Sequence, residues 1–272
     1  MKRLGFIHQD SLRRLYKLKS LHIEADVDNT WDAEFNQNHE YSLVIKSDSL
    51  EWLYLEGVEY NPDYMQYNLK KLETLELYKA KLNCNNLFSL DCFSTLKYLH
   101  LVASVTSNFK TELLAKASKL EGLRLVFVEN IKIDSLTQRL FKNLVTLKYL
   151  SLKGLKLKKI NRNLFKPLVN LEELTLSHNQ IQRLENGTFK ENVNLKMLDI
   201  SFNRLDGLDF AQLLGHLNKL KEFNMSDNIS YGYILWSSLA NQMPPNLESF
   251  NYQSNFENNF LNFQIIFYFF KN

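Results

Sequence analysis

Three residue types that often dictate a fold are scarce in this chain. Its 272 residues include two cysteines, four prolines and eight glycines. The glycines are scattered and not grouped into a loop that cradles a phosphate. Cys84 and Cys92 lie close together in the sequence, where two buried thiols are the favoured interpretation and a local disulfide is the alternative.

Long apolar runs and a surplus of one charge are absent as well. No stretch of 18 apolar residues occurs, so we expect no membrane helix. Leu4–Ile7 is followed at once by polar residues, so we expect no secretory signal in the chain as written. The 33 basic and 30 acidic residues are interspersed, and a net charge of +3 is too small to indicate nucleic acid as a partner.

What the sequence has instead is one repeated pattern. Leu-x-x-Leu-x-Leu or a close variant begins ten times, at intervals of 22 to 32 residues: Leu18, Leu50, Leu72, Leu96, Leu120, Leu147, Leu171, Leu195, Leu220 and Leu247. The fourth and sixth positions alternate, so both point to one face of a short strand. One copy cannot enclose its own leucines, so neighbouring copies must stack. We therefore expect an α/β fold: a curved solenoid with a parallel β-sheet on its concave face and loops and short helices on its convex face.

The pattern also divides the chain into regions. We expect an irregular segment at 1–17, a repeat domain of about ten copies at 18–257, and an aromatic-rich tail at 258–272. The tail is interpreted as the start of another repeat, with a truncated membrane segment or a non-native tail as alternatives. Good helix formers predict convex helices within 111–120 and 210–217.

Catalytic signatures are missing from this pattern. The sequence contains no G-x-G-x-x-G, G-x-x-x-x-G-K-[ST], H-E-x-x-H or C-x-x-C. His22, His100 and His178 lie three copies apart from one another, about 14 Å at the spacing of strands, so they cannot share a metal. We expect no enzymatic activity, no cofactor and no metal site.

Asparagines follow the later copies of the pattern. The amide of such a residue can donate to and accept from backbone groups where the chain leaves the strand. We predict a structural ladder of Asn179, Asn203, Asn228 and Asn255. Earlier copies have Asp26, Val58, Ala80, Ser104, Val128 and Leu155 at that position. Because most of these side chains form no hydrogen bond, water or other backbone groups must satisfy the turns, and we expect looser coils there.

Phenylalanines recur on the limb that returns to the next strand, at Phe165 and Phe189 and in earlier copies at Phe93 and Phe141. With L-x-x-L-x-L-x-x-N-x-L at 171–181 and 195–205, they make the chain resemble the extracellular class of leucine-rich repeats. The irregular spacing and incomplete asparagine ladder resemble Toll-like receptor ectodomains most. The resemblance covers residues 18 to about 255. It implies a non-enzymatic module that binds a protein or other macromolecule, within an extracellular or cell-surface receptor.

The chain departs from that class in its cysteines. Extracellular leucine-rich-repeat proteins usually close the ends of the solenoid with cysteine clusters, which are absent here. A fragment of a larger receptor explains the missing caps, signal and membrane span together. The alternative is a cytoplasmic leucine-rich-repeat adaptor or inhibitor, of the substrate-recognition or ribonuclease-inhibitor type.

Aromatic side chains mark the candidate binding surface. Tyr and Trp bury much area at interfaces and still form hydrogen bonds, although they also suit strands for reasons of packing alone. The predicted partner-binding residues of the concave face are Trp52, Tyr54, Tyr78, Tyr98, His100, Arg124 and Tyr149.

Two further surface features follow from the repeat. Sequons at Asn186 and Asn224 are predicted to be open to glycosylation, whereas the sequon at Asn228 is predicted to stay unmodified because Asn228 belongs to the ladder. Basic residues crowd the sixth copy: Lys148, Lys153, Lys156, Lys158, Lys159 and Arg162. We interpret them as a solvated face, with an anionic glycan, lipid head group or nucleic acid as alternative ligands.

Overall fold

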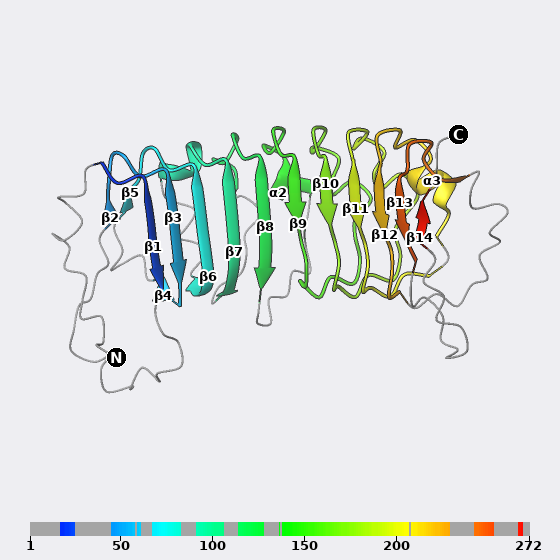
Figure 1. Cartoon of the computed structure of the whole chain (residues 1–272), viewed down its shortest axis with the longest axis horizontal. Helices are drawn as coiled ribbons and strands as arrows, with labels where there is room; N and C mark the ends of the chain where they lie inside the picture. The colour runs from blue at the N-terminus through cyan, green and yellow to red at the C-terminus, as the bar shows by residue number, and fades with distance from the viewer. Residues whose placement is uncertain are drawn as a thin grey trace, which may run out of the picture. The chain divides into compact units, whose positions relative to one another are not determined.

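A computed structural model (Figure 1) describes residues 17–24, 45–57, 59–60, 67–82, 91–105, 114–127, 136, 138–206, 208–228, 242–252 and 266–268. Outside these residues lie positions 1–16 of the predicted N-terminal segment 1–17, most of the predicted tail, Cys84 and Asn255. The chain forms two compact units. Unit 1 comprises residues 1–119 and 127–131, and unit 2 comprises residues 120–126 and 132–272.

Unit 1 is built on parallel strands. Four of them pair in chain order: β1 (Ser20–Glu24), β3 (Trp52–Glu56), β6 (Thr74–Leu82) and β7 (Tyr98–Val105). The short strand β4 (Glu59–Tyr60) also pairs with β6, and β2 (Ile45–Lys46) and β5 (Tyr67–Asn68) form a separate parallel pair. A 3-10 helix, Asp91–Ser94, lies on the limb that leads to β7.

Unit 2 repeats the same arrangement. Its parallel strands also pair in chain order: β8 (Gly122–Phe127), β9 (Tyr149–Ser151), β10 (Glu173–Thr175), β11 (Met197–Asp199), β12 (Glu222–Asn224) and β13 (Ser249–Asn251). Helices α2 (Gln138–Phe141) and α3 (Phe210–Leu214) lie on the return limbs. The ten copies of the sequence pattern therefore correspond to the ten strands β1, β3 and β6 to β13.

Leucines and phenylalanines fill the core, as the pattern predicts. In the copies that contain β9 and β10, the fourth and sixth residues of the pattern are buried: Leu150, Leu152, Leu174 and Leu176. The return limbs contribute a column of stacked rings, in which Phe165 lies 6.5 Å from Phe141 and 5.9 Å from Phe189 between ring centroids. Because each coil buries its apolar side chains against the next, the core is continuous along unit 2.

The four repeat strands of unit 1, β1, β3, β6 and β7, are longer than most strands of unit 2. β6 and β7 have nine and eight residues, whereas β9 to β12 have three each. Pairing of β6 with β7 continues past a bulge at Lys79, from Ala80↔Ala103 to Leu82↔Val105. Where no ladder asparagine ends the strand, the neighbouring strand satisfies the backbone instead. Longer paired strands thus replace the looser coils that we predicted for β6 and β7.

A left-handed backbone conformation recurs at one fixed position of the repeat. The eighth position of the pattern has φ between 47° and 73° in six copies: Gly57, Lys79, Gly154, His178, Phe202 and Asp227. Glycine adopts this conformation readily, but a side chain makes it unfavourable by about 1–2 kcal/mol. Phe202 keeps this conformation although its ring is 45% exposed.

Two sequence-based expectations need correction. The described part of 111–120 forms tight turns rather than a helix, and Leu114, Ala117 and Leu120 are buried there. In the tail, β14 (Ile266–Tyr268) runs antiparallel to β13, so it is not the parallel strand that another repeat would add. α3, in contrast, lies within the predicted helical segment 210–217. Within the described residues, no helix has the length and apolar character needed to cross a membrane.

Candidate binding surface

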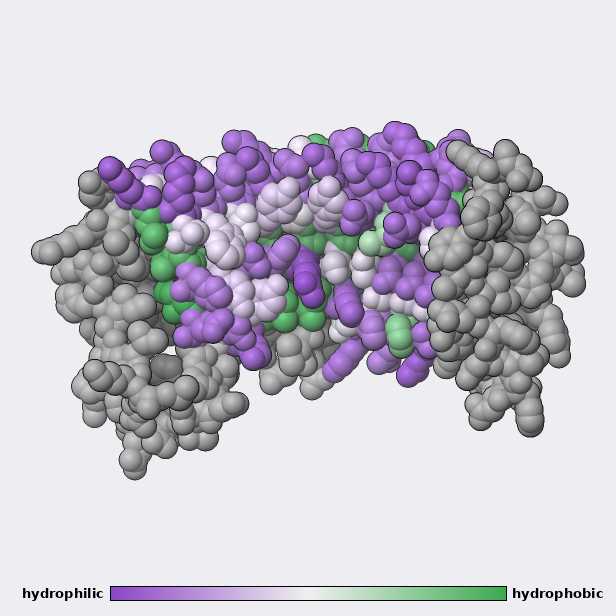
Figure 2. Space-filling model, in the orientation of Figure 1, coloured by the Kyte–Doolittle hydropathy of each residue, from purple (hydrophilic) through white to green (hydrophobic). Residues whose placement is uncertain are grey.

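The open face of the unit 1 sheet carries most of the predicted binding residues. We define the aromatic face as Trp52, Tyr54, Tyr78, Tyr98 and His100. Strand register aligns Trp52 with Thr74 and Tyr98 in one row. Tyr54, Glu76 and His100 form the next row, and Glu56 and Tyr78 a third. Figure 2 shows side chains of intermediate hydropathy among hydrophilic ones over this part of the sheet.

Ring stacking fixes the centre of the aromatic face. The Tyr54 ring lies 5.1 Å from that of Tyr78, with an interplanar angle of 24°. On its other side, the imidazole of His22 lies 4.0 Å from the Tyr54 ring. Such ring pairs stabilise by about 0.5–1.5 kcal/mol beyond the area they bury. The rings are therefore ordered before any partner arrives, which lowers the entropy cost of binding.

Glu76 links two strands across the aromatic face. Trp52 donates from Nε1 to Oε1 of Glu76 over 2.8 Å. His100 Nδ1 lies 3.4 Å from the other carboxylate oxygen, Oε2. One carboxylate from β6 thus orients an indole from β3 and an imidazole from β7.

A second carboxylate, Glu56, orients the phenol of Tyr54. Tyr54 donates its hydroxyl proton to Glu56 Oε2, and Lys79 Nζ lies 3.0 Å from Oε1. The hydrogen bond from Tyr54, followed by the contact with Lys79, lowers the pKa of Glu56. The same hydrogen bond, together with burial and the charge of Glu56, raises the pKa of Tyr54 well above its ordinary range. Because the folded-state pKa of Glu56 lies below the unfolded value, its stabilising effect is present above the unfolded pKa and is lost as pH falls through the folded pKa.

Removing the Tyr54 hydroxyl should release Glu56. In Tyr54→Phe, the ring can still stack on His22 and Tyr78, but the hydroxyl donor is gone, so the pKa of Glu56 should move up toward its ordinary value. A carboxyl carbon NMR titration measures this shift. Tyr149→Phe, which changes a hydroxyl in unit 2, should leave Glu56 unchanged. An unaltered Glu56 titration in Tyr54→Phe would contradict the assigned hydrogen bond.

The other two predicted binding residues belong to unit 2. Arg124 is exposed on β8 and Tyr149 is 39% exposed on the neighbouring β9. The row that contains Arg124 continues with small polar or acidic side chains: Ser151, Thr175, Asp199, Asn224 and Asn251. Apart from Tyr149 on the open strand face, the aromatic character of the candidate surface is thus a property of unit 1.

Buried asparagines form hydrogen bonds between consecutive coils of unit 2, beyond the end of each strand. Asn203 donates from Nδ2 to the carbonyls of Leu176, Ile200 and Ser201 at 3.0–3.1 Å, and its Oδ1 accepts from the Ile181 amide at 3.0 Å. Asn179 and Asn228 make the equivalent contacts in their own coils. Each amide side chain therefore satisfies backbone groups of two consecutive coils.

Comparison with known proteins finds a family model that matches part of unit 2. A family model described as leucine rich repeat matches residues 121–181 and 169–229. The fold is a leucine-rich-repeat solenoid. No curated protein matches the chain.

Solved leucine-rich-repeat structures share the fold at low sequence identity. A leucine-rich-repeat protein of Leptospira interrogans is 20% identical with a TM-score of 0.59, over 77% of this chain and 58% of that one. A chain of the Drosophila Toll–Spatzle complex is 17% identical with a TM-score of 0.59, over 88% of this chain and 31% of that one. A chain of the mouse RP105/MD-1 complex is 21% identical with a TM-score of 0.51, over 76% of this chain and 39% of that one. The chain spans less than two thirds of each, and these similarities show the fold alone.

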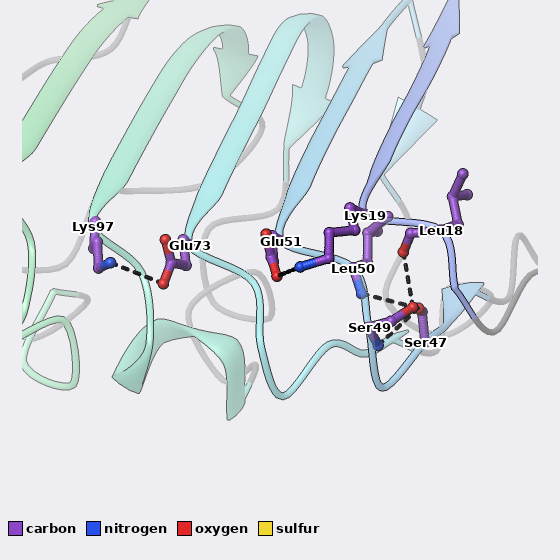
Figure 3. Close-up of polar contacts among 8 residues, drawn as sticks. All are labelled: Leu18, Lys19, Ser47, Ser49, Leu50, Glu51, Glu73 and Lys97. Carbon is purple, nitrogen blue, oxygen red and sulfur yellow. Dashed lines mark hydrogen bonds and ion pairs between the residues drawn. The ribbon is translucent and has the colours of Figure 1, made fainter.

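Ion pairs line the edge of the leucine-rich-repeat sheet where the strands begin, a feature that our sequence-based reasoning missed. The second position of the pattern is charged in all ten copies: Lys19, Glu51, Glu73, Lys97, Glu121, Lys148, Glu172, Lys196, Lys221 and Glu248. Successive residues pair as Lys19–Glu51, Glu73–Lys97, Glu121–Lys148, Glu172–Lys196 and Lys221–Glu248. Figure 3 shows the two pairs of unit 1, and Figure 2 shows that this edge is hydrophilic. Exposed pairs contribute about 0–1 kcal/mol each, so this charged edge adds little stability.

A second set of polar contacts precedes six of the ten repeat strands and was also missed. The residue before the first leucine of the pattern donates to a carbonyl of the preceding coil at 2.7–2.8 Å in six copies: Ser49, Thr95, Thr146, Asn170, Asn194 and Asn246. Figure 3 shows the first of these, from Ser49 Oγ to the Leu18 carbonyl. The sequence signal is a hydroxyl or amide at one fixed position of the repeat.

The described residues contain no group of three or more histidine, cysteine or acidic side chains placed to bind a metal ion. Cys92 is buried on the return limb that leads to β7. The polar groups of the aromatic face orient its rings.

Proposed function

We propose that this chain is a non-enzymatic recognition module that binds a protein through the aromatic face, within a leucine-rich-repeat domain spanning residues 18–257. The observation that carries the proposal is the ring cluster of the open strand face, in which Tyr54 stacks on Tyr78, contacts the tilted His22 ring and donates its hydroxyl proton to Glu56. Aromatic side chains with polar tips are enriched at interface hot spots, and order in the free protein reduces the cost of association.

We further propose that the module belongs to a receptor-like ectodomain. Two structures of similar fold are complexes, one of Toll with Spatzle and one of RP105 with MD-1. The phenylalanine column of the return limbs supports the extracellular class of repeat. The alternative, a cytoplasmic adaptor or inhibitor, is favoured by the low cysteine content.

Alanine at Tyr54 and Tyr98 should abolish partner binding. The full chain is immobilised, and the proteins it retains from an extracellular fraction are quantified by mass spectrometry. We expect at least one protein that wild type retains and Tyr54→Ala/Tyr98→Ala retains at least ten-fold less, because interface aromatics commonly contribute about 2 kcal/mol or more each.

The matched control is Ser151→Ala/Thr175→Ala, which changes two residues on the open strand face of unit 2 and should retain the same proteins as wild type. Circular dichroism of each variant establishes that the fold is intact. An identical set of proteins on wild type and Tyr54→Ala/Tyr98→Ala would refute the role of the aromatic face.

Glycosylation is proposed at Asn186, with Asn224 as a second acceptor. Asn186 is exposed on a return limb and donates to Gln212 Oε1, whereas Asn224 is half-buried on the sheet. Asn228 is fully engaged in the ladder and should carry no sugar. Peptide mapping of the chain expressed through a secretory pathway tests this. Sugar on Asn228, or an unmodified Asn186, contradicts the proposal.

A further inference from the structure

One side of unit 2 carries an unusual concentration of positive charge. Residues 135–171 contain nine basic and no acidic residues, although the chain as a whole has nearly equal numbers of each. The basic residues are Arg139, Lys142, Lys148, Lys153, Lys156, Lys158, Lys159, Arg162 and Lys166. This bias lies within the coil that contains β9 and its flanking limbs.

Burial in the repeat forces these charges outward. Leu155, Leu157 and Ile160 point into the core and are 4–5% exposed, while the lysines between them are exposed. Lys153, on the near side of the left-handed Gly154, is exposed as well. The limb that leaves β9 therefore presents lysine ammonium groups along its whole outer side.

The next two coils extend this surface. The Gln182 amide donates to the Lys158 carbonyl at 3.3 Å, so Arg183 follows beside Lys159. The Arg204 amide donates to the Ile181 carbonyl at 2.9 Å, which places Arg204 one coil further on. We define the basic strip by its residues: Lys153, Lys156, Lys158, Lys159, Arg162, Arg183 and Arg204. At strand spacing, three coils give the strip a width of about 10 Å. In the sequence, Glu185 and Asp206 follow Arg183 and Arg204 by two residues.

Most of the strip lacks a compensating carboxylate. At the strand-start edge of the same coil, Lys148 pairs with Glu121 at 2.9 Å. In the described part of the chain, no acidic oxygen lies within 4.0 Å of Lys153, Lys158, Lys159 or Arg162. Neighbouring unpaired cations raise the local potential and attract a polyanion, with an affinity that falls as salt is added.

We infer that the basic strip binds a sulfated polysaccharide. Single-stranded nucleic acid is held by a succession of rings on which bases stack, and all seven side chains of the strip are Lys or Arg. Duplex recognition requires an element that enters a groove, whereas the strip follows the limbs of the coils. A chain of sulfated sugars needs only a row of cations and hydrogen-bond donors, and Gln180 and Gln182 lie between the charges of the neighbouring coils. This site lies in unit 2 and is independent of the aromatic face.

Heparin tests the inference directly. The full chain should bind immobilised heparin, and Lys156→Gln/Lys158→Gln/Lys159→Gln should elute at lower NaCl, with at least ten-fold weaker affinity at physiological salt. By analogy with phosphate contacts, the slope of log affinity against log salt should fall by about 2 to 3. Lys70→Gln/Lys71→Gln/Lys116→Gln removes the same charge from exposed positions of unit 1 and should elute with wild type.

Equal elution of the triple variant and wild type would overturn the inference. An equal loss of heparin affinity in the control variant would also overturn it, because net charge alone would then explain the binding. Tighter binding of duplex DNA or of anionic phospholipid vesicles than of heparin would also overturn it. If the triple variant fails to fold by circular dichroism, the single variant Lys158→Gln is measured instead, and wild type is compared on heparin and on desulfated heparin. Equal retention on those two matrices contradicts the inference.

Discussion

Replacing Phe165 with alanine should lower the free energy of unfolding by about 3–5 kcal/mol, the range for a fully buried ring. Phe165 is completely buried and stacks between Phe141 and Phe189. Its loss leaves a cavity that touches three consecutive coils, and the backbone on either side is fixed by neighbouring repeats, so the site cannot collapse. Urea unfolding followed by circular dichroism measures the change.

Two variants control this prediction. Phe165→Leu keeps most of the volume and should cost less than Phe165→Ala. Phe202→Ala removes a ring that is 45% exposed at the end of β11, and it should change stability by no more than about 0.5 kcal/mol. Equal effects of Phe165→Ala and Phe202→Ala would show that the ring column is not a main element of the core.

Asn203→Ala should destabilise the chain by about 3 kcal/mol, because leaving each buried backbone group unsatisfied costs about 1–3 kcal/mol. The side chain bonds one amide and three carbonyls of two coils. Asn203→Asp is nearly the same size but loses the Nδ2 donor and buries a carboxylate, so it should be at least as harmful.

The matched control for Asn203 is Asn163→Ala, which truncates an exposed asparagine on a return limb and should be close to neutral. The measurement is again the midpoint of urea unfolding at constant m-value. A small effect of Asn203→Ala with a large effect of Asn163→Ala would contradict the assignment of the ladder.

The repeat pattern predicts the strands because burial leaves little choice. A residue such as Leu174 must face inward, so the register of Thr175 follows, and the position of each strand can be written down from the leucines. Glycine at positions 57 and 154 also signals the left-handed strand end, but Phe202 and His178 adopt the same geometry without any such signal. At these two residues, the stacking of the coils overrides the intrinsic preference of the backbone for negative φ.

The contacts within the aromatic face could not be predicted in this way. Register places Tyr54 beside Glu76 and His22, but it does not say that Tyr54 would donate to Glu56 or that Trp52 would reach Glu76. Those choices depend on rotamers and on competition among several acceptors. The prediction of a helix within 111–120 was wrong, because intrinsic helix propensity is a weak guide that tertiary packing overrides.

The most direct test of the central claim is site-specific photo-cross-linking from the aromatic face. p-Benzoylphenylalanine is placed at Tyr98 in one protein and at Thr175, on the unit 2 sheet, in another, and both are irradiated in the same extracellular fraction. We predict a discrete protein adduct from position 98 that is missing from position 175 and is lost when Tyr54→Ala is added. Adducts from position 175 alone, or equal adducts from both positions, would contradict binding through the aromatic face.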